Sequence, residues 1–271
     1  MAVQQQVAYY RMVCIDVDGT LLDSRHQPAP GAQQALDAML ARGVLPVLAS
    51  GRTRVGVKPL LRQFGLGPAH IGGGGAYACG PDGELLFSRP ITPDVLPVLV
   101  QRARRVGLGP ALHYLDETII EGSAAHEHAM RQYNAGQCPR VPDLLAPDFD
   151  VPLKLTLWGE SDELDEFAAW VRTTDLEQSV EMVRSNQVFL EFNQVGVSKG
   201  AAVTVLAAAL GIPLERVMTV GDQFNDVSMF AVAGLSVAMG NAPEGVKQSA
   251  THVAPTNDEG GLAWAIHTFV L

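Results

Sequence analysis

Cysteine is scarce in this sequence of 271 residues, and no uninterrupted apolar run is long enough to span a bilayer. The three cysteines, Cys14, Cys79 and Cys138, are odd in number and not closely paired, which argues against a disulfide framework and against a zinc site. The stretch MAVQQQVAYYRM at the start lacks the apolar core of a signal peptide. We therefore expect a soluble protein of the reducing cytoplasm, with no membrane partner.

Positive charge is scarce as well. Lysine and arginine number 19 against 29 aspartates and glutamates, so the formal net charge is −10 and the pI is near 5.1. No local basic block opposes this field, which disfavours nucleic acid as a partner. The hydrophobic content of 47% is ample for a packed core, and the length suits one large domain or two modest ones.

A run of four glycines at residues 72–75 lacks the Gly-Lys-Ser/Thr that completes a nucleotide-binding P-loop. We interpret this run as backbone that turns tightly or passes close to another segment, because glycine tolerates both.

The chain is organised around MVCIDVDGTLLDS, residues 12–24. The apolar run Met12–Ile15 predicts a buried strand, which ends in a polar turn that carries Asp16 and Asp18. Residues i and i+2 of an extended segment face the same side, so both carboxylates are expected at the carboxyl edge of a sheet, where open α/β folds bind ligands. Two such charges need a cation, a shared proton or a separating twist of the backbone. A simple turn is the alternative for these residues alone.

Strands and helices alternate on both sides of the chain's middle. This alternation is typical of a doubly wound, Rossmann-like parallel sheet with crossover helices. Pro46 cannot donate to a sheet ladder, so we expect it at the beginning of its strand or at a bulge. The predicted strands are 44–49, 217–220, 235–239 and 251–254, and the predicted helices are 30–42, a segment ending near 64, 198–210 and a closing segment from about 259.

The middle of the chain has a different texture. Helical and strand-like stretches alternate there around a proline-rich segment at 139–152, which indicates a separate α+β unit inserted into the first sheet. We expect a core at 1–83 and 194–271 and the inserted unit at 84–193. Predicted elements are a hairpin at 76–88, helices at 94–106, 123–133 and 161–173, and strands at 111–115, 153–158 and 188–192.

Three further groups of polar residues follow strands or begin helices. Ser50 with the amide of Gly51 is suited to hold a phosphate at a helix amino end, although a plain helix cap is the alternative. Lys199 is expected near a helix start, where the helix dipole disfavours a cation unless an anion lies nearby, and a solvated surface lysine is the alternative. A carboxylate of the first turn is able to attack phosphorus and form an aspartyl-phosphate.

The last group contains Asp222, Asn225 and Asp226. If Asp222 begins a helix, Asp226 lies on the same helical face, and like charges at this spacing destabilise a helix by a few tenths of a kcal/mol. A bound divalent cation reverses the sign of this effect. Ligands that are all oxygen atoms favour Mg²⁺ over zinc or copper.

The motifs DVDGTLLDS, SGR, VSKG and GDQFND, in this order, resemble the four motifs of the haloacid dehalogenase superfamily of phosphatases. The tail GNAPEGVKQSATHVAPTNDEGGLAWAI is similar to that of the Cof-type branch, in which a large α/β cap lies between the second and third motifs. The resemblance covers essentially the whole chain. Two departures are Gly74-Gly75-Ala76, where the family often has Asn-Gly-Ala, and Pro46 in a strand usually free of proline.

The resemblance implies that Asp16 is the nucleophile and Asp18 the general acid/base of an aspartyl-phosphate mechanism. It implies that Mg²⁺ is held by Asp16, by the main-chain carbonyl of Asp18, by Asp222 and, through water, by Asp226. The residues that bind the transferring phosphoryl group are then Ser50, Gly51 and Lys199, with Asn225 positioning Lys199 or that group.

We therefore expect a Mg²⁺-dependent phosphatase of small phosphorylated metabolites, with sugar phosphates first. Phosphoryl transfer of the phosphomutase type and a non-catalytic regulator that binds phosphometabolites are the alternatives, and monomer and homodimer stay open. Residues 84–193 are expected to form a movable lid with glycine hinges at Gly83 and Gly196. Candidate specificity residues in this span are His113, Tyr114, His126, His128, Arg131, Lys154, Arg184 and Glu191.

Overall fold

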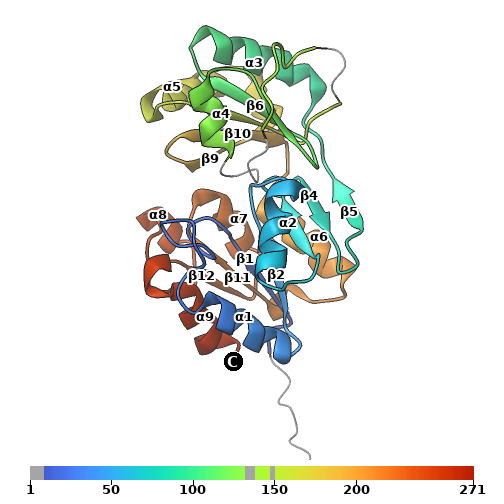
Figure 1. The fold of residues 1–271 in the computed structure, drawn as a ribbon, viewed down its shortest axis with the longest axis vertical. Helices are drawn as coiled ribbons and strands as arrows, with labels where there is room; N and C mark the ends of the chain where they lie inside the picture. The colour runs from blue at the N-terminus through green and yellow to red at the C-terminus, as the bar shows by residue number, and fades with distance from the viewer. Residues whose placement is uncertain (1–8, 132–137, 147–149) are drawn as a thin grey trace, which may run out of the picture.

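A computed structural model describes residues 9–131, 138–146 and 150–271, which form a larger core and a smaller cap stacked on it (Figure 1). The core strands are β1 (Met12–Ile15), β2 (Leu45–Ala49), β3 (His70–Gly72), β4 (Tyr77–Cys79), β5 (Leu85–Ser88), β11 (Val217–Gly221), β12 (Leu235–Ala238) and β13 (His252–Val253). The core helices are α1 (Ala32–Ala41), α2 (Arg54–Gln63), α6 (Lys199–Ala209), α7 (Val227–Phe230), α8 (Glu244–Lys247) and α9 (Gly261–Phe269).

The core sheet has the strand order β13-β12-β11-β1-β2-β3-β4-β5. The strands from β13 to β3 are parallel, and β4 and β5 close the other edge as antiparallel strands. Every residue of β1 is buried because both faces of the sheet are covered. Val13 and Ile15 pack with α1, α2 and α9, whereas Met12 and Cys14 pack with α6, α7 and α8.

Pro46 is the second residue of β2, close to the beginning of the strand, as the sequence predicts. The N–H of Leu45 donates to Arg11 on the β1 side, so the nitrogen of Pro46 faces the other side. There, β3 pairs only with Leu48 and Ala49. Among the described residues, no strand is paired with β2 opposite the nitrogen of Pro46, so the absence of an N–H there costs the sheet no hydrogen bond.

The cap contains a fully antiparallel sheet of order β7-β6-β8-β10-β9. One face of this sheet packs on α3 and α5 through a row of leucines and phenylalanines, and the other face is turned toward the core (Figure 1). The cap elements are α3 (Leu96–Arg105), α4 (Ala124–Arg131), α5 (Ser161–Arg172), β6 (Gly109–His113), β7 (Thr118–Ile120), β8 (Lys154–Trp158), β9 (Val180–Asn186) and β10 (Phe189–Gln194).

Several boundaries differ from the sequence expectations. Strand β5 belongs to the core sheet, although the expected boundary at residue 84 places it in the inserted unit. Gly83 consequently lies in the β4–β5 turn, before the chain leaves the core sheet, and is not at the crossing point. The patterns also missed β7 and β9, and the expected end of the helix at 123–133 lies partly outside the described residues.

The glycine run behaves as interpreted. Gly73, Gly74 and Gly75 have positive φ values of 60°, 71° and 105°, a region that side chains disfavour. A Cβ on Gly75 would lie 2.2 Å from the carbonyl oxygen of Ser198, so this loop passes directly against the start of α6.

No helix in the described ranges combines the length and apolar character needed to cross a membrane.

Candidate active site

Three neighbouring parallel strands end at the site. Asp16 follows β1, Ser50 follows the adjacent β2, and Asp222 follows β11 on the other side of β1. Because the carboxyl ends of parallel strands meet at one edge of a sheet, these residues from distant parts of the sequence come together there. All three side chains are buried.

The centre of the site is a cluster of three buried carboxylates. Ligand oxygens of Asp16, Asp222 and Asp226 lie within 4.8 Å of one another. Lys199, which is 1% exposed, donates from Nζ to Oδ1 of Asp16 at 2.5 Å and to Oδ1 of Asp226 at 2.6 Å. Asp16 and Asp226 are thus the anions that stabilise a lysine at the first position of α6. Because Lys199 is buried, the alternative of a solvated surface lysine is wrong.

Burial and mutual repulsion control ionisation in this cluster. Burial raises the pKa of Asp16 well above its usual range, while Lys199 opposes this shift and the carboxylates of Asp226 and Asp222 add to it. Burial, followed by repulsion from Asp226, raises the pKa of Asp222 to about 7. Burial lowers the pKa of Lys199, but the attraction of Asp16 and Asp226 outweighs it and the pKa rises above its ordinary value. The site therefore favours an added positive charge.

The arrangement of Asp222 and Asp226 differs from the helical spacing expected. Asp222 directly follows β11, and Asp226 ends the 3₁₀ turn Phe224–Asp226, so the two do not share a helical face. Oδ2 of Asp226 accepts the backbone N–H groups of Asp222 and Gln223, both at 2.9 Å. A Cβ on Gly221 would lie 2.5 Å from Cγ of Asp226, so this close turn needs glycine.

Asp222 is held by three side chains. Its Oδ1 accepts from the Thr20 hydroxyl at 3.1 Å, and its Oδ2 accepts from Gln223 at 3.1 Å and Asn241 at 3.3 Å. Gly19 has φ of 92°, and a Cβ there would lie 2.4 Å from Oδ2 of Asp222. The loop after β1 thus leaves room for this carboxylate only because residue 19 is glycine.

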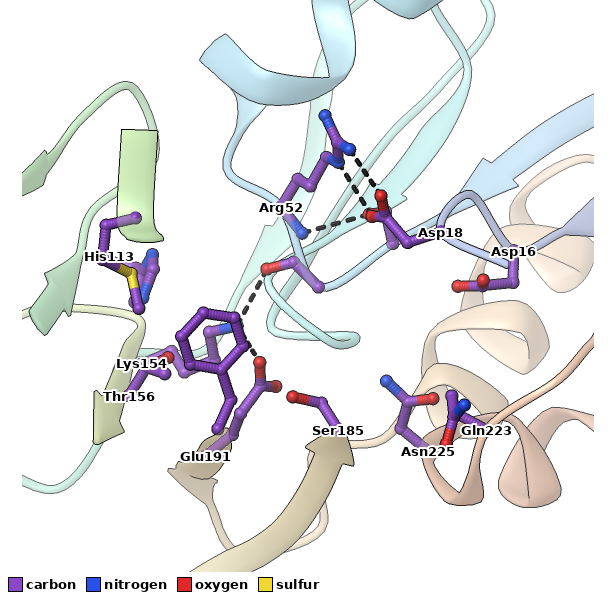
Figure 2. Close-up of a pocket in the computed structure, with 14 residues that line it drawn as sticks. Asp16, Asp18, Arg52, His113, Lys154, Thr156, Ser185, Glu191, Gln223 and Asn225 are labelled. Atoms are coloured by element: carbon purple, nitrogen blue, oxygen red, sulfur yellow. Dashed lines mark hydrogen bonds and ion pairs between the residues drawn. The ribbon is translucent and has the colours of Figure 1, made fainter. Parts of the chain in front are cut away.

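Asp18 is turned toward Arg52 (Figure 2). The guanidinium of Arg52 donates to both oxygens of Asp18, at 2.9 and 2.6 Å. Burial raises the pKa of Asp18, but hydrogen bonds from His26 and Arg52 outweigh burial and lower it to about 2. Asp18 is therefore ionised in this arrangement, and its carboxylate is not part of the acidic cluster.

Ser50 does not cap a helix. The N-cap position of α2 belongs to Thr53, and the Ser50 hydroxyl instead accepts the backbone N–H of Arg52 at 3.1 Å. The N–H of Gly51 has no hydrogen-bond partner among the described residues. Ser50 and Gly51 thus present a hydroxyl and a backbone donor at the end of β2, beside Asp16 and Asp18 in one cleft.

Two buried cap residues reach the loops of the core. Lys154 of β8 donates to the carbonyl of Gly51 at 2.8 Å and to Glu191 of β10 at 3.0 Å. Asn193 of β10 donates to the carbonyl of Gly73 at 2.8 Å. The cap therefore contacts the backbone of the phosphate-site candidate directly.

Core and cap enclose a cleft of about 610 Å³, a volume that includes the open space at its mouth (Figure 2). Asn225 lies on its core side, and the buried Oδ1 of Asn225 has no partner in the described ranges. Lys199 is held by Asp16 and Asp226 and not by Asn225.

The cap candidates from the sequence separate into two groups. His113, Lys154 and Glu191 line the cleft. The other candidates do not line it. Arg131 and His128 are exposed, and Arg131 pairs with Glu127. Arg184 donates to Ser161 on the helix-covered side of the sheet, His126 packs on Trp158, and Tyr114 packs against the cap core.

Sequence reasoning missed other residues that line the cleft. The alternation of polar and apolar residues in KLTLW was a usable signal for Thr156, which lies on the same face as Lys154. Arg52 and Gln223 stand inside the SGR and GDQFND motifs but were given no role of their own, and no local signal marks Met130, Ser185 and Phe189.

Together, fold and site define a capped α/β protein with a buried cluster of three carboxylates and a lysine at the edge of its parallel sheet. The chain belongs to the haloacid dehalogenase-like hydrolase family, whose model matches residues 13–266. The parallel core and the inserted cap agree with the fold class that the sequence predicts. The protein is a phosphoric monoester hydrolase.

Similarity to known proteins extends over the whole chain. A phosphatase of Bacillus subtilis, YwpJ, is 30% identical over 93% of this chain and 97% of its own length. The 5-amino-6-(5-phospho-D-ribitylamino)uracil phosphatase of the same organism is 26% identical, with full coverage of both chains. A haloacid dehalogenase-like hydrolase from Bacteroides thetaiotaomicron has a TM-score of 0.85 and 29% identity, covering 96% of this chain and 99% of its own.

Proposed function

We propose that this protein is a Mg²⁺-dependent phosphatase that hydrolyses small phosphorylated metabolites, sugar phosphates among them, through an aspartyl-phosphate on Asp16. The observation that carries the proposal is the buried cluster of Asp16, Asp222 and Asp226 with Lys199, in which Asp16 also lines the cleft that presents Ser50 and Gly51. A relative named as a phosphatase of a phosphorylated ribityl compound supports a small phosphorylated metabolite as substrate.

The reaction has two displacements at phosphorus. An oxygen of Asp16 forms a bond to phosphorus as the bond to the ester oxygen breaks, and the ester oxygen takes a proton from Asp18. Water then attacks the aspartyl-phosphate and gives its proton to Asp18, while the bond between phosphorus and Asp16 breaks. Inorganic phosphate leaves and the Asp16 carboxylate is restored. Lys199, Ser50, Asn225 and the Gly51 amide bind the oxygens of the transferring group.

The acidic cluster fits a hard divalent cation. Its donors are all carboxylate oxygens, and the raised pKa of Asp222, caused by burial and by Asp226, indicates negative charge in excess of what Lys199 neutralises. Asp16 and Asp222, supported by Asp226 and by the carbonyl of Asp18, would hold Mg²⁺. When bound, the ion would supply positive charge that offsets the charge of the nucleophile and of the phosphoryl group.

Asp18 must exchange partners during this cycle. With a pKa of about 2 it is ionised and is ready to accept a proton, as the second displacement requires. To donate a proton in the first displacement, it has to leave Arg52 and acquire one. We therefore propose that the pair of Asp18 and Arg52 opens when substrate enters the cleft.

The test is phosphate release from p-nitrophenyl phosphate and from a set of phosphorylated metabolites, without any acceptor. We expect turnover with Mg²⁺, loss of turnover with EDTA, and recovery when Mg²⁺ is restored. Asp16→Asn should abolish it, whereas Asp37→Asn, on the exposed side of α1, serves as the matched control. Turnover that requires a second sugar as acceptor would indicate a phosphomutase, and full activity in EDTA would contradict the role of the metal.

The cytoplasmic location stays a prediction. The described chain has its three cysteines free and buried, which is compatible with a reducing compartment.

A further inference from the structure

Three buried polar atoms on the cap side of the cleft have no hydrogen-bond partner among the described residues. They are Nε2 of His113, Oγ1 of Thr156 and Oγ of Ser185, which come from β6, β8 and β9. His113 is 5% exposed and Thr156 is 2% exposed, and all three residues line the same cleft. Because buried polar atoms in native proteins are almost always paired, three such atoms in one cleft point to hydrogen bonds with a bound molecule.

The register of the cap sheet explains why these atoms gather. Thr156 is paired with Glu191 of β10, and His113 is paired with Lys154, so the side chains occupy neighbouring positions on the face turned toward the core. The Nδ1 atom of His113 lies 2.9 Å from the hydroxyl of Thr118, which fixes the ring. Phe189 and Met130 add an apolar wall to the cleft.

The cap side of the cleft offers no free positive charge. Lys154 is the one lysine or arginine among the described cap residues that line it, and its ammonium is already bonded to Glu191 and to the carbonyl of Gly51. Arg140, which is paired with Ile120 at the edge of the sheet, is exposed and does not line the cleft. Burial, and then the nearby Lys154, lower the pKa of His113 well below its usual range, so the ring is neutral.

The surroundings add no free cation on the cap side either. Arg52, the other cation that lines the cleft, belongs to the core and lies beside Asp18, where the transferring phosphoryl group is expected. Arg131 is paired with Glu127. The segments 132–137 and 147–149, which lie outside the described ranges, contain neither lysine nor arginine. A second phosphate or a carboxylate on the substrate would thus be buried beside Glu191 without a counter-ion, which is strongly unfavourable.

We propose that the cap side of the cleft is a leaving-group subsite for uncharged, hydroxyl-bearing groups, bound by His113, Thr156 and Ser185, and that it rejects leaving groups with a second anionic group. This inference rests on the proposed phosphatase function. It assigns selection by charge to the pair of Lys154 and Glu191, which together leave the subsite without net positive charge.

The experiment compares matched substrates that differ only in charge. The pairs are glycerol 3-phosphate with 3-phosphoglycerate, erythritol 4-phosphate with 4-phosphoerythronate, and glucitol 6-phosphate with 6-phosphogluconate. We expect kcat/KM for the uncharged member to exceed that of its carboxylate partner at least tenfold in the pair with the best substrate. The aryl phosphate is assayed in parallel as the measure of core chemistry.

Variants then assign the selection to residues. Glu191→Gln leaves Lys154 without its counter-ion and should move the ratio of kcat/KM toward the carboxylate substrates about tenfold or more, a ratio that a general loss of activity does not change. Thr156→Val should lower the ratio of kcat/KM between the best polyol phosphate and the aryl phosphate about three- to tenfold. Thr156→Ser, which keeps the hydroxyl, should restore it, and Thr173→Val, an exposed cap position, is the matched control.

The outcomes separate the two proposals. Release of phosphate from the aryl phosphate, combined with equal or better turnover of the carboxylate substrates, would overturn the subsite and leave the phosphatase function intact. An unchanged substrate ratio in both Glu191→Gln and Thr156→Val would also overturn it. No release from any substrate, the aryl phosphate included, would overturn the phosphatase function and the subsite with it.

Discussion

Replacing Asp222 by asparagine should stabilise the metal-free protein while destroying its response to Mg²⁺. In the folded chain this carboxylate is buried beside Asp226, which raises its pKa to about 7. Below the pKa of the unfolded state, near 4, the carboxyl is protonated in both states and costs no stability. As the pH rises from about 4 to about 7, the carboxyl ionises in the unfolded state but stays protonated in the folded state, so the folded protein loses stability. An asparagine does not ionise, so the variant avoids this loss.

The size of the effect follows from the difference between a pKa of about 7 in the folded chain and about 4 in an unperturbed aspartate. The ionisation penalty is then on the order of 1 to 2 kcal/mol at pH 5 and on the order of 4 kcal/mol at pH 8. For a chain of this size that corresponds to a gain in Tm of roughly 8–16 °C for Asp222→Asn at pH 8 in EDTA. The amide can keep the existing contacts by donating to Thr20 and accepting from Gln223.

The assay is thermal unfolding of both proteins at pH 5 and pH 8, with EDTA or with saturating Mg²⁺. The difference between wild type and variant at each pH cancels the contributions of other titrating groups, such as His26 and His113. Mg²⁺ should raise the Tm of the wild type, more at pH 8 than at pH 5, and should have little effect on the variant. Asp37→Asn is the control for a loss of charge on the surface.

Two results would refute this reasoning. A variant that is less stable than the wild type in EDTA at pH 8 would mean that Asp222 is not an excess buried charge. A stability difference that does not grow between pH 5 and pH 8 would mean that its pKa lies outside this window.

Three further predictions concern the neighbouring residues. Lys199→Met should lower kcat/KM by about 10²- to 10⁴-fold with p-nitrophenyl phosphate, because a preorganised positive charge beside Asp16 is lost, and near-normal kinetics would return Lys199 to a structural role. Asp16→Asn should eliminate the single-turnover burst, whereas Asp18→Asn should retain part of it with this good leaving group, and equal losses would contradict the separate roles. In Arg52→Leu the pKa of Asp18 should rise from about 2, so the acid limb of intermediate breakdown should move to higher pH in a stopped-flow profile, and an unmoved limb would argue against control by Arg52.

Much of the site was predictable because it depends on strand ends. Asp16, Ser50 and Asp222 each follow an apolar stretch that is recognisable in the sequence, and parallel topology alone brings such ends together. The odd position of Lys199 at a helix start also pointed to a nearby anion, which the structure places at 2.6 Å in Asp226.

Contacts that depend on long-range geometry were not predictable. Asp18 and Arg52 are 34 residues apart, and nothing local indicates that the guanidinium takes both oxygens of this carboxylate. The spacing of Asp222 and Asp226 suggested a helix, but the chain forms a 3₁₀ turn there instead. In this turn the carboxylate of Asp226 accepts the backbone N–H of Asp222, which would otherwise lack a partner after β11.

The cap was harder to read than the core because its sheet is antiparallel and its strands lack the continuous apolar runs of buried parallel strands. Strands β7 and β9 carry no strong alternating pattern, and their pairing is set by neighbours that are distant in sequence. The partners of Lys154 depend on this register, so the sequence identified Lys154 and Glu191 as candidates without showing that they form one buried pair.

The hydrogen bonds from Lys154 and Asn193 to the carbonyls of Gly51 and Gly73 make cap position and active-site backbone thermodynamically linked. Any ligand that orders the loop after β2 also favours the docked cap, and by reciprocity a docked cap tightens the binding of that ligand. An undocked cap would release both carbonyls at once, so the loop that we propose as the phosphate site would lose its supports at the moment when water can enter freely. Phosphate alone should therefore slow the separation of the cap from the core, even though it touches only the core.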